Sequence, residues 1–357
     1  MKKTNIKRIV IKVGSNLLIK DGEINKTYII ELSRKISNLY KRGIKVILIS
    51  SGANAAGLNY LNLSRAKTLL QKQAICSIGQ VQMMKIYENA FNFFGQKISQ
   101  ILLTKDDFTN RKRFLNLKNT LIGLNQLNIL PIINENDSIS TEEIMFGDND
   151  MLSAMFSIGW NADGLMLMTS VDGVYNDEKK IMKEFKDESS ILSMKKTSYG
   201  SGGINSKIDS AKLSSNSGIK TCICNGKKLE NIDYFINNES CGTMFFPKKK
   251  IKNRKAWIIF LSKSKGRVFI NSGAKEALEE NKSLLSIGVI KVYGSFEKGD
   301  VVDIYDENED KIGKGIINYS YIETVKIIGK KSSEFEKILG YYSYDELIHR
   351  DNIGIVK

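Results

Sequence analysis

The chain reads Arg8-Ile-Val-Ile-Lys-Val-Gly-Ser15 near its start and Lys45-Val-Ile-Leu-Ile-Ser-Ser-Gly-Ala53 further on. Both are β-branched and aliphatic runs that stop at small residues. Near-continuous apolar runs of this kind are typical of strands buried on both faces of a parallel sheet. Between them, residues 28–40 have the apolar spacing of an amphipathic helix. The two runs therefore predict a strand–helix–strand unit of an α/β fold.

The same alternation continues to about residue 246. Strand-like runs lie at 100–103, 129–133, 165–168 and 221–224, and helical patterns lie at 64–94, 114–127, 150–160 and 206–217. Strands that alternate with helices form a parallel sheet with helices on both faces. We therefore expect residues 1–250 to form a three-layer αβα sandwich with a mainly parallel central sheet.

The pattern changes after Pro247, which opens a charged segment ending at Lys255 that we interpret as an interdomain linker. Beyond it, short strand-like runs at 257–261, 267–270, 288–293, 301–305 and 315–317 are interrupted by one helical pattern at 274–280. Short strands separated by glycine and Asp/Asn turns predict a small, strongly curved β-barrel. Residues 255–357 are therefore expected to form a second domain.

The composition excludes several classes of protein. With 42% hydrophobic and 26% charged residues, the chain is typical of a globular protein. No apolar run is long enough to span a membrane, and the basic start lacks a signal-peptide core, so we expect a cytoplasmic protein. Four cysteines without a CxxC pair and a single histidine favour neither a disulfide framework nor a metal site.

The net charge of +15 invites a nucleic-acid interpretation, but its distribution argues against one. Residues 255–357 carry 16 basic and 16 acidic side chains, so the whole excess lies in the first 254 residues. Binding to a phosphate backbone needs a basic surface. The charge pattern favours a solvated basic surface with a preference for anionic substrates.

Two familiar nucleotide-binding motifs, GxxxxGK[ST] and a GxGxxG after a strand, are absent from the sequence. Instead, Gly14-Ser15 and Ser51-Gly52 each follow a predicted strand. Ligands of open α/β sheets bind at the carboxyl ends of strands, where backbone N–H groups can hold an anion. The two loops are thus expected to face one crevice.

Other residues point to the same crevice. Lys12 lies inside an apolar strand, where a charge is costly unless it meets an anion. Asn134-Glu-Asn-Asp137 follows a buried strand and fits recognition of a small zwitterion. Gly147-Asp-Asn-Asp150 fits the same role, or equally an N-cap with an acidic first turn. Gly200-Ser-Gly-Gly-Ile-Asn-Ser-Lys207 leads into a helix and forms a second anion-binding loop.

These motifs, in this order, resemble the amino acid kinase family. The pair Ile133-Asn-Glu-Asn-Asp137 and Gly147-Asp-Asn-Asp150 is similar to that of its glutamate 5-kinase members. The later part, through Gly273-Ala-Lys-Glu-Ala-Leu278 and Gly294-Ser-Phe-Glu-Lys-Gly-Asp300, resembles the PUA domain that extends them.

The resemblance implies transfer of the γ-phosphoryl group of ATP to the side-chain carboxylate of L-glutamate, the first step of proline biosynthesis. It implies that Lys12 and Lys207 neutralise the charge on the transferred group and that Asp150 orients both lysines. It places around glutamate the residues Ser51, Gly52, Asn134, Asp137 and Asn149. It further implies proline as a feedback inhibitor and a homo-oligomeric assembly.

For ATP, the resemblance implies the residues Lys12, Gly14, Thr169, Ser170, Ser201, Gly202, Gly203, Ile204, Asn205, Ser206 and Lys207. Mg²⁺ would be held mainly by phosphate oxygens and water. Two positions depart from the family pattern. Ser170 stands where relatives usually have aspartate, and Ile204 stands where they often have methionine.

Two alternatives remain open. One is a sibling kinase that phosphorylates another acceptor, such as acetylglutamate or aspartate. The other is a protein that binds or modifies RNA through its PUA-like domain, which the neutral charge of residues 255–357 disfavours.

Overall fold

The computed structural model describes residues 6–140, 149–176, 178–186, 203–247 and 253–355. Contacts divide the chain into two units, Met1–Lys250 and Ile251–Lys357, and each unit has its own hydrophobic core. The boundary between the units falls inside the charged segment that follows Pro247.

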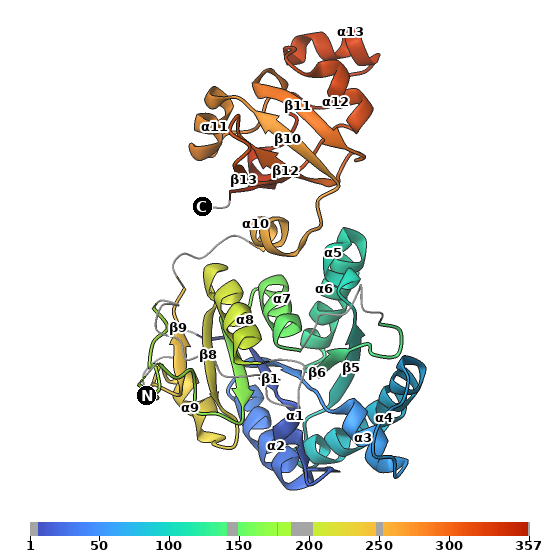
Figure 1. Ribbon diagram of the computed structural model, residues 1–357, viewed down its shortest axis with the longest axis vertical. Helices are drawn as coiled ribbons and strands as arrows, with labels where there is room; N and C mark the ends of the chain where they lie inside the picture. The colour runs from blue at the N-terminus through green and yellow to red at the C-terminus, as the bar shows by residue number, and fades with distance from the viewer. Residues whose placement is uncertain (1–5, 141–148, 177, 187–202, 248–252, 356–357) are drawn as a thin grey trace. The chain divides into compact units, whose positions relative to one another are not determined.

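Among the described residues, seven strands form the central sheet of the first unit (Figure 1). In spatial order they are β5 (Ile98–Leu103), β6 (Leu130–Glu135), β4 (Lys45–Ile49), β1 (Arg8–Val13), β7 (Gly164–Thr169), β8 (Lys220–Asn225) and β9 (Thr243–Phe245). All neighbouring pairs are parallel except β8 and β9. The mainly parallel sheet expected from the sequence is thereby confirmed.

β1 lies at the centre of this sheet, between β4 and β7. Val10 is opposite Ile47 on one side and Leu165 on the other. The chain runs from β1 to β4 on one side and reaches β7 on the other side only after β6. This change of direction makes the carboxyl end of β1 the place where an open α/β sheet forms a ligand crevice.

Helices cover both faces of the sheet (Figure 1). One layer contains α2 (Lys26–Lys41), α3 (Ala53–Tyr60), α4 (Leu69–Phe93) and α9 (Glu230–Ile236). The other contains α6 (Arg111–Gln126), α7 (Asn149–Trp160) and α8 (Ile204–Asn216). The short helices α1 (Ser15–Leu18) and α5 (Asp106–Thr109) follow β1 and β5. These layers form the predicted three-layer sandwich.

Local signals set where the helices begin. The Asn25 side chain accepts a hydrogen bond from the Tyr28 N–H at the start of α2. The Thr68 side chain accepts one from the Gln71 N–H at the start of α4. Such caps satisfy N–H groups that have no partner inside the helix. The Thr68 cap explains why the helix expected over residues 64–94 begins at Leu69.

The second unit has, among its described residues, a five-stranded sheet. Its spatial order is β11 (Val289–Gly294), β10 (Gly266–Ile270), β12 (Val301–Tyr305), β13 (Lys311–Ile316) and β14 (Ile353–Ile355). Register shifts after Phe269 and after Ile304 bend the strands. The two-residue strands β2 (Ile19–Lys20) and β3 (Glu23–Ile24) form a separate hairpin in the first unit.

Two expectations for the second unit were wrong. Residues Trp257–Leu261, predicted as a strand, form a π-helical turn after α10 (Asn253–Ala256). A short apolar run is compatible with a strand or with a buried helical turn, and here Trp257, Ile258 and Leu261 are buried together.

The second wrong expectation was a single helix in this unit. Besides α11 (Ser272–Glu279), the unit contains α12 (Tyr321–Ile327) and α13 (Phe335–Leu339). The start of α12 carries a capping box between Ser320 and Glu323, and this four-residue pattern could have revealed the helix.

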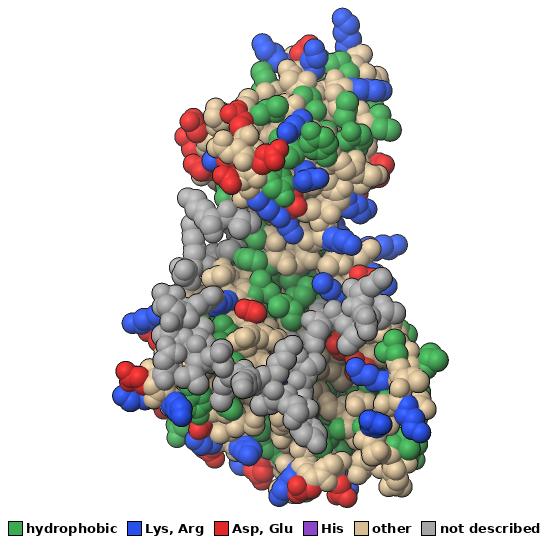
Figure 2. Space-filling view, in the orientation of Figure 1, with side chains coloured by type: hydrophobic (Ala, Val, Ile, Leu, Met, Phe, Trp, Pro, Cys, Tyr) green, Lys and Arg blue, Asp and Glu red, His purple; other side chains and the backbone are tan. Residues whose placement is uncertain are grey.

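Figure 2 shows both acidic and basic side chains on the visible face of the second unit, with the acidic ones gathered mainly toward its left. Within the described ranges, no helix combines the length and the apolar character needed to cross a membrane.

Candidate active site

Lys12 projects from the central strand and is buried, with 5% of its surface exposed. Its ammonium lies 2.7 Å from Oδ1 of Asp150, a residue in the first turn of α7. Two residues further, the Gly14 N–H donates a hydrogen bond to the carbonyl oxygen of Met168. The carboxyl end of β1 is thus held between the start of α7 and the end of β7.

Asp150 binds a second cation at its other oxygen. Nζ of Lys207, in the first turn of α8, lies 2.9 Å from Oδ2 of Asp150. The Asp150 side chain is 1% exposed, and those of Lys12 and Lys207 are 7% and 12% exposed. Burial alone would raise the pKa of Asp150, but the two ammonium groups hold that pKa below its ordinary value. We call Lys12, Asp150 and Lys207 the lysine–aspartate triad. It carries a net charge of about +1 in a site closed to most solvent.

A polar cluster lies beside the triad because Asn149 directly precedes Asp150. Nδ2 of Asn149 lies 2.8 Å from the Ser50 carbonyl oxygen, 2.9 Å from Ser51 Oγ and 2.9 Å from Asn134 Oδ1. These groups come from the ends of β4 and β6. The structure thus brings together Ser51, Asn134 and Asn149, which the family resemblance assigned to one pocket.

Gly52 completes this part of the site. It has a φ of +93° and precedes α3, in the left-handed region that glycine adopts without strain. This turn lets the chain leave β4 with Ser51 facing Asn149. A side chain at position 52 would strain the same turn.

Asp137 lies in the loop after β6, partly buried against α4. Burial raises the pKa of Asp137, while Lys72 and a hydrogen bond from Cys76 act to lower it. Burial also raises the pKa of the Cys76 thiol to about 12. The thiol therefore stays protonated and acts as a donor to the carboxylate.

The residues expected to bind ATP lie along the neighbouring strand ends. Thr169 ends β7 and Ser170 follows it, and the Thr169 carbonyl oxygen accepts a hydrogen bond from the Gly226 N–H after β8. Gly203 precedes α8, whose first turn contains Ile204, Asn205 and Ser206. Ser201 and Gly202 lie outside the described residues, as do Gly147 and Asp148.

Sequence reasoning missed three residues of α4 that border this site. Lys72, Cys76 and Gln80 are spaced four apart, and Cys76 and Gln80 contact the Asn134–Asp137 segment. Residues four apart lie on one face of a helix. A polar stripe at this spacing inside the long helix was a usable signal.

The described residues contain no group of three or more His, Cys, Asp or Glu side chains able to hold a metal ion. Both oxygens of the buried Asp150 already face ammonium groups. This donor set fits a magnesium ion bound through phosphate oxygens and water rather than through a protein cage.

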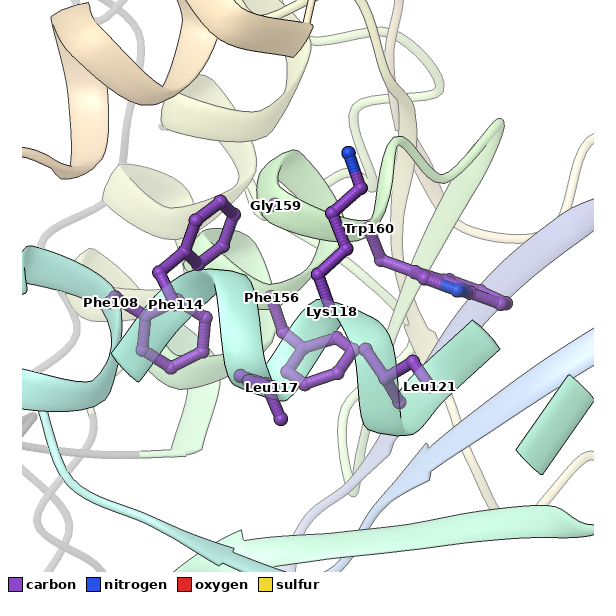
Figure 3. Close-up of a pocket in the computed structure, with 8 residues that line it drawn as sticks. All are labelled: Phe108, Phe114, Leu117, Lys118, Leu121, Phe156, Gly159 and Trp160. Carbon is purple, nitrogen blue, oxygen red and sulfur yellow. The ribbon is translucent and has the colours of Figure 1, made fainter. Parts of the chain in front are cut away.

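A small apolar hollow lies elsewhere in the first unit, between α5, α6 and the second half of α7 (Figure 3). Its lining residues are Phe108, Phe114, Leu117, Lys118, Leu121, Phe156, Gly159 and Trp160. Its volume of ≈ 10 Å³ is about that of one water molecule, far below the size of a nucleotide or an amino acid. The lysine–aspartate triad and the polar cluster beside it, at the start of α7, are therefore the better candidate site.

Comparisons with known proteins identify the family and the fold. Residues 7–225 match the amino acid kinase family, and residues 266–339 match the PUA domain. A solved carbamate kinase of Giardia has 18% identity and a TM-score of 0.50, covering 69% of this chain and all of its own, a likeness of fold alone.

Similarity to curated proteins extends over the whole chain. A glutamate 5-kinase of Kosmotoga olearia is 54% identical over 352 residues, covering 97% of this chain and 98% of the relative. That of Thermotoga maritima is 49% identical over 351 residues, covering 98% and 99%. That of Aquifex aeolicus is 41% identical over 356 residues, also covering 98% and 99%. The chain therefore belongs to the amino acid kinase family, among its glutamate 5-kinases, and carries a C-terminal PUA domain.

Proposed function

We propose that this protein transfers the γ-phosphoryl group of ATP to the side-chain carboxylate of L-glutamate, giving L-glutamyl 5-phosphate, the first step of proline biosynthesis. The observation that carries the proposal is the buried lysine–aspartate triad beside the Ser51–Asn134–Asn149 cluster. Full-length similarity to three glutamate 5-kinases supports it. We further propose a cytoplasmic location, where ATP and glutamate are available.

This reaction needs positive charge at the transferred group and correct placement of the reactants, and it needs no general base. A carboxylate is already a nucleophile, so attack on the γ-phosphorus needs no proton removal. Negative charge spreads over the oxygens of the transferred group, and preorganised cations stabilise it. Lys12 and Lys207 supply these cations. Asp150 holds both ammonium groups in place through its two oxygens.

Glutamate binds on the Asn134 and Asn149 side of the triad. Asp137 pairs with its ammonium group, since a partly buried carboxylate is a strong partner for a cation. Ser51 and the turn at Gly52 face the same pocket and position the carboxylate that reacts.

ATP binds on the other side, at the ends of β7 and β8. Gly14 allows close approach of the phosphates, and the amino-terminal N–H groups of α8, which begins after Gly203, bind the outer phosphates. Thr169 and Ser170 lie toward the nucleoside. Mg²⁺ would be held mainly by phosphate oxygens and water, and would supply further positive charge to the transferred group.

An ADP-release assay tests this assignment. The purified protein with ATP and Mg²⁺ should release ADP with L-glutamate at a higher kcat/KM than with acetylglutamate, aspartate or UMP. A preference for one of the other acceptors would make the protein a sibling kinase.

The same assay with added proline tests our further proposal that the end product competes at the glutamate pocket. Light scattering tests the proposed homo-oligomer.

Asp137→Asn is expected to raise the KM for glutamate about 10- to 100-fold, because a hydrogen bond to a charged group contributes ~1.5–3 kcal/mol. The KM for ATP should stay nearly unchanged. Steady-state kinetics with each substrate varied in turn measures both values. Asp209→Asn, an exposed position on α8, is the matched control. An unchanged glutamate KM in Asp137→Asn would remove Asp137 from the pocket.

We also propose that the first unit is sufficient for the reaction and folds alone. All residues assigned to the reaction precede Ser210, and the two units have separate cores. A fragment of residues 1–254 is expected to unfold cooperatively and to release ADP with glutamate. Thermal denaturation and the ADP assay check these two outcomes. A fragment that is folded but inactive would mean that the PUA domain contributes to catalysis.

A further inference from the structure

Gln80 is a buried polar side chain on α4 whose contacts lead to the candidate glutamate pocket. Its Oε1 accepts a hydrogen bond of 2.9 Å from Nδ2 of Asn134. A second hydrogen bond of Asn134 determines which of its two amide atoms faces Gln80. The Glu135 N–H can only donate, and it donates to Oδ1 of Asn134, so Nδ2 must face Gln80.

The orientation of the Asn149 amide follows from its contacts with Asn134 and Ser50. Oδ1 of Asn134 accepts from Nδ2 of Asn149, and the Ser50 carbonyl, which can only accept, binds the same nitrogen. Oδ1 of Asn149 is left buried and, among the described residues, has no hydrogen-bond partner. Leaving a buried acceptor without a donor is unfavourable, so this oxygen calls for a donor from a ligand.

The backbone holds Gln80 firmly in this place. The preceding residue, Gly79, lies at the crossing of α3 and α4, where an added Cβ would be 1.8 Å from the Ala53 carbonyl oxygen. Gly57 faces the same crossing, and a Cβ there would be 2.1 Å from the Ile75 carbonyl oxygen. The two glycines therefore allow a close packing that fixes α4 against the turn after β4.

We propose that Gln80 is a positioning residue for the acceptor substrate. Through its hydrogen bond to Asn134 it holds the Asn149 amide in place, so that Oδ1 of Asn149 receives a hydrogen bond from the α-ammonium group of glutamate. The ammonium is the group of glutamate that carries protons to donate at neutral pH, since both its carboxylates only accept. This inference rests on the proposed function and adds a second acceptor for the ammonium beside Asp137.

The test compares Gln80→Met, which keeps the length of the side chain but lacks a strong acceptor, with Gln80→Glu, which retains one. Gln80→Met is expected to raise the KM for glutamate about tenfold, ~1.4 kcal/mol. Its kcat and its KM for ATP should stay near the wild-type values. Gln80→Glu should recover most of the affinity. Gln82→Met, a partly buried position on the same helix, is the matched control and should match wild type.

Glutarate, which lacks the amino group, separates this role from a purely structural one. Its inhibition constant against glutamate is expected to be the same in the wild type and in Gln80→Met. An inhibition constant that rises as much as the glutamate KM would overturn the proposal, as would an unchanged glutamate KM or a parallel rise in the KM for ATP. Failure of the proposed function looks different, because the wild-type protein itself would then show no glutamate-dependent ADP release.

Discussion

Replacing Lys12 with alanine is expected to lower kcat for glutamate phosphorylation by about 10²–10³-fold, the usual cost of one preorganised contact to a transition-state charge. Lys207→Ala should have an effect of the same order, because the two ammonium groups bind opposite oxygens of Asp150 and face the same site. The KM for glutamate should change far less, since the charge on the transferred group is greatest in the transition state.

Steady-state kinetics with saturating ATP measures these effects, and Lys41→Ala, at the exposed end of α2, serves as the control. A Lys12→Ala enzyme with a nearly normal kcat and only a raised KM would show that Lys12 binds the ground state and not the transferring group.

Asp150→Asn is expected to affect both catalysis and stability. It leaves two buried lysines without their counter-charge, and breaking a buried ion pair by removing one partner costs about 3–5 kcal/mol of folding free energy. The kcat should fall by at least the factor expected for Lys12→Ala, because both ammonium groups lose their fixed position. Urea denaturation and the ADP assay measure the two effects.

The stability effect has a defined pH dependence. The two lysines hold the folded-state pKa of Asp150 below its ordinary value, so the stabilisation is present above the unfolded pKa of about 3.9. It is lost as the pH falls through the lower folded-state pKa. The difference in unfolding free energy between wild type and Asp150→Asn should therefore narrow on strong acidification. A difference that stays constant from pH 7 into this acid range would contradict the charge assignment.

Most features of the fold and the candidate site that could be predicted came from patterns among residues close together in the sequence. Lys12 inside an aliphatic strand and the small residues at 14–15 and 51–52 already pointed to the edge of the sheet where the candidate site lies. Asn149 and Asp150 were identified as either ligands or helix caps, and in the structure they occupy the first turn of α7 and also contact Lys12, Ser51 and Asn134.

Contacts between distant elements could not be predicted in the same way. Gln80 reaches Asn134 only because Gly57 and Gly79 let two helices pack closely, and nothing in the local pattern of α4 fixes that crossing. The strand prediction for Trp257–Leu261 was wrong for a related reason, since a short apolar run takes its conformation from what it packs against.

Trapping the product with hydroxylamine tests the central claim most directly. An acyl phosphate on the glutamate side chain reacts with hydroxylamine to give γ-glutamyl hydroxamate, whereas ATP hydrolysis leaves nothing to trap. With ATP, Mg²⁺ and L-glutamate, the account predicts one hydroxamate for each ADP released, and neither product in Lys12→Ala beyond a small residual rate. ADP release with glutamate but without hydroxamate would contradict phosphoryl transfer to the side-chain carboxylate.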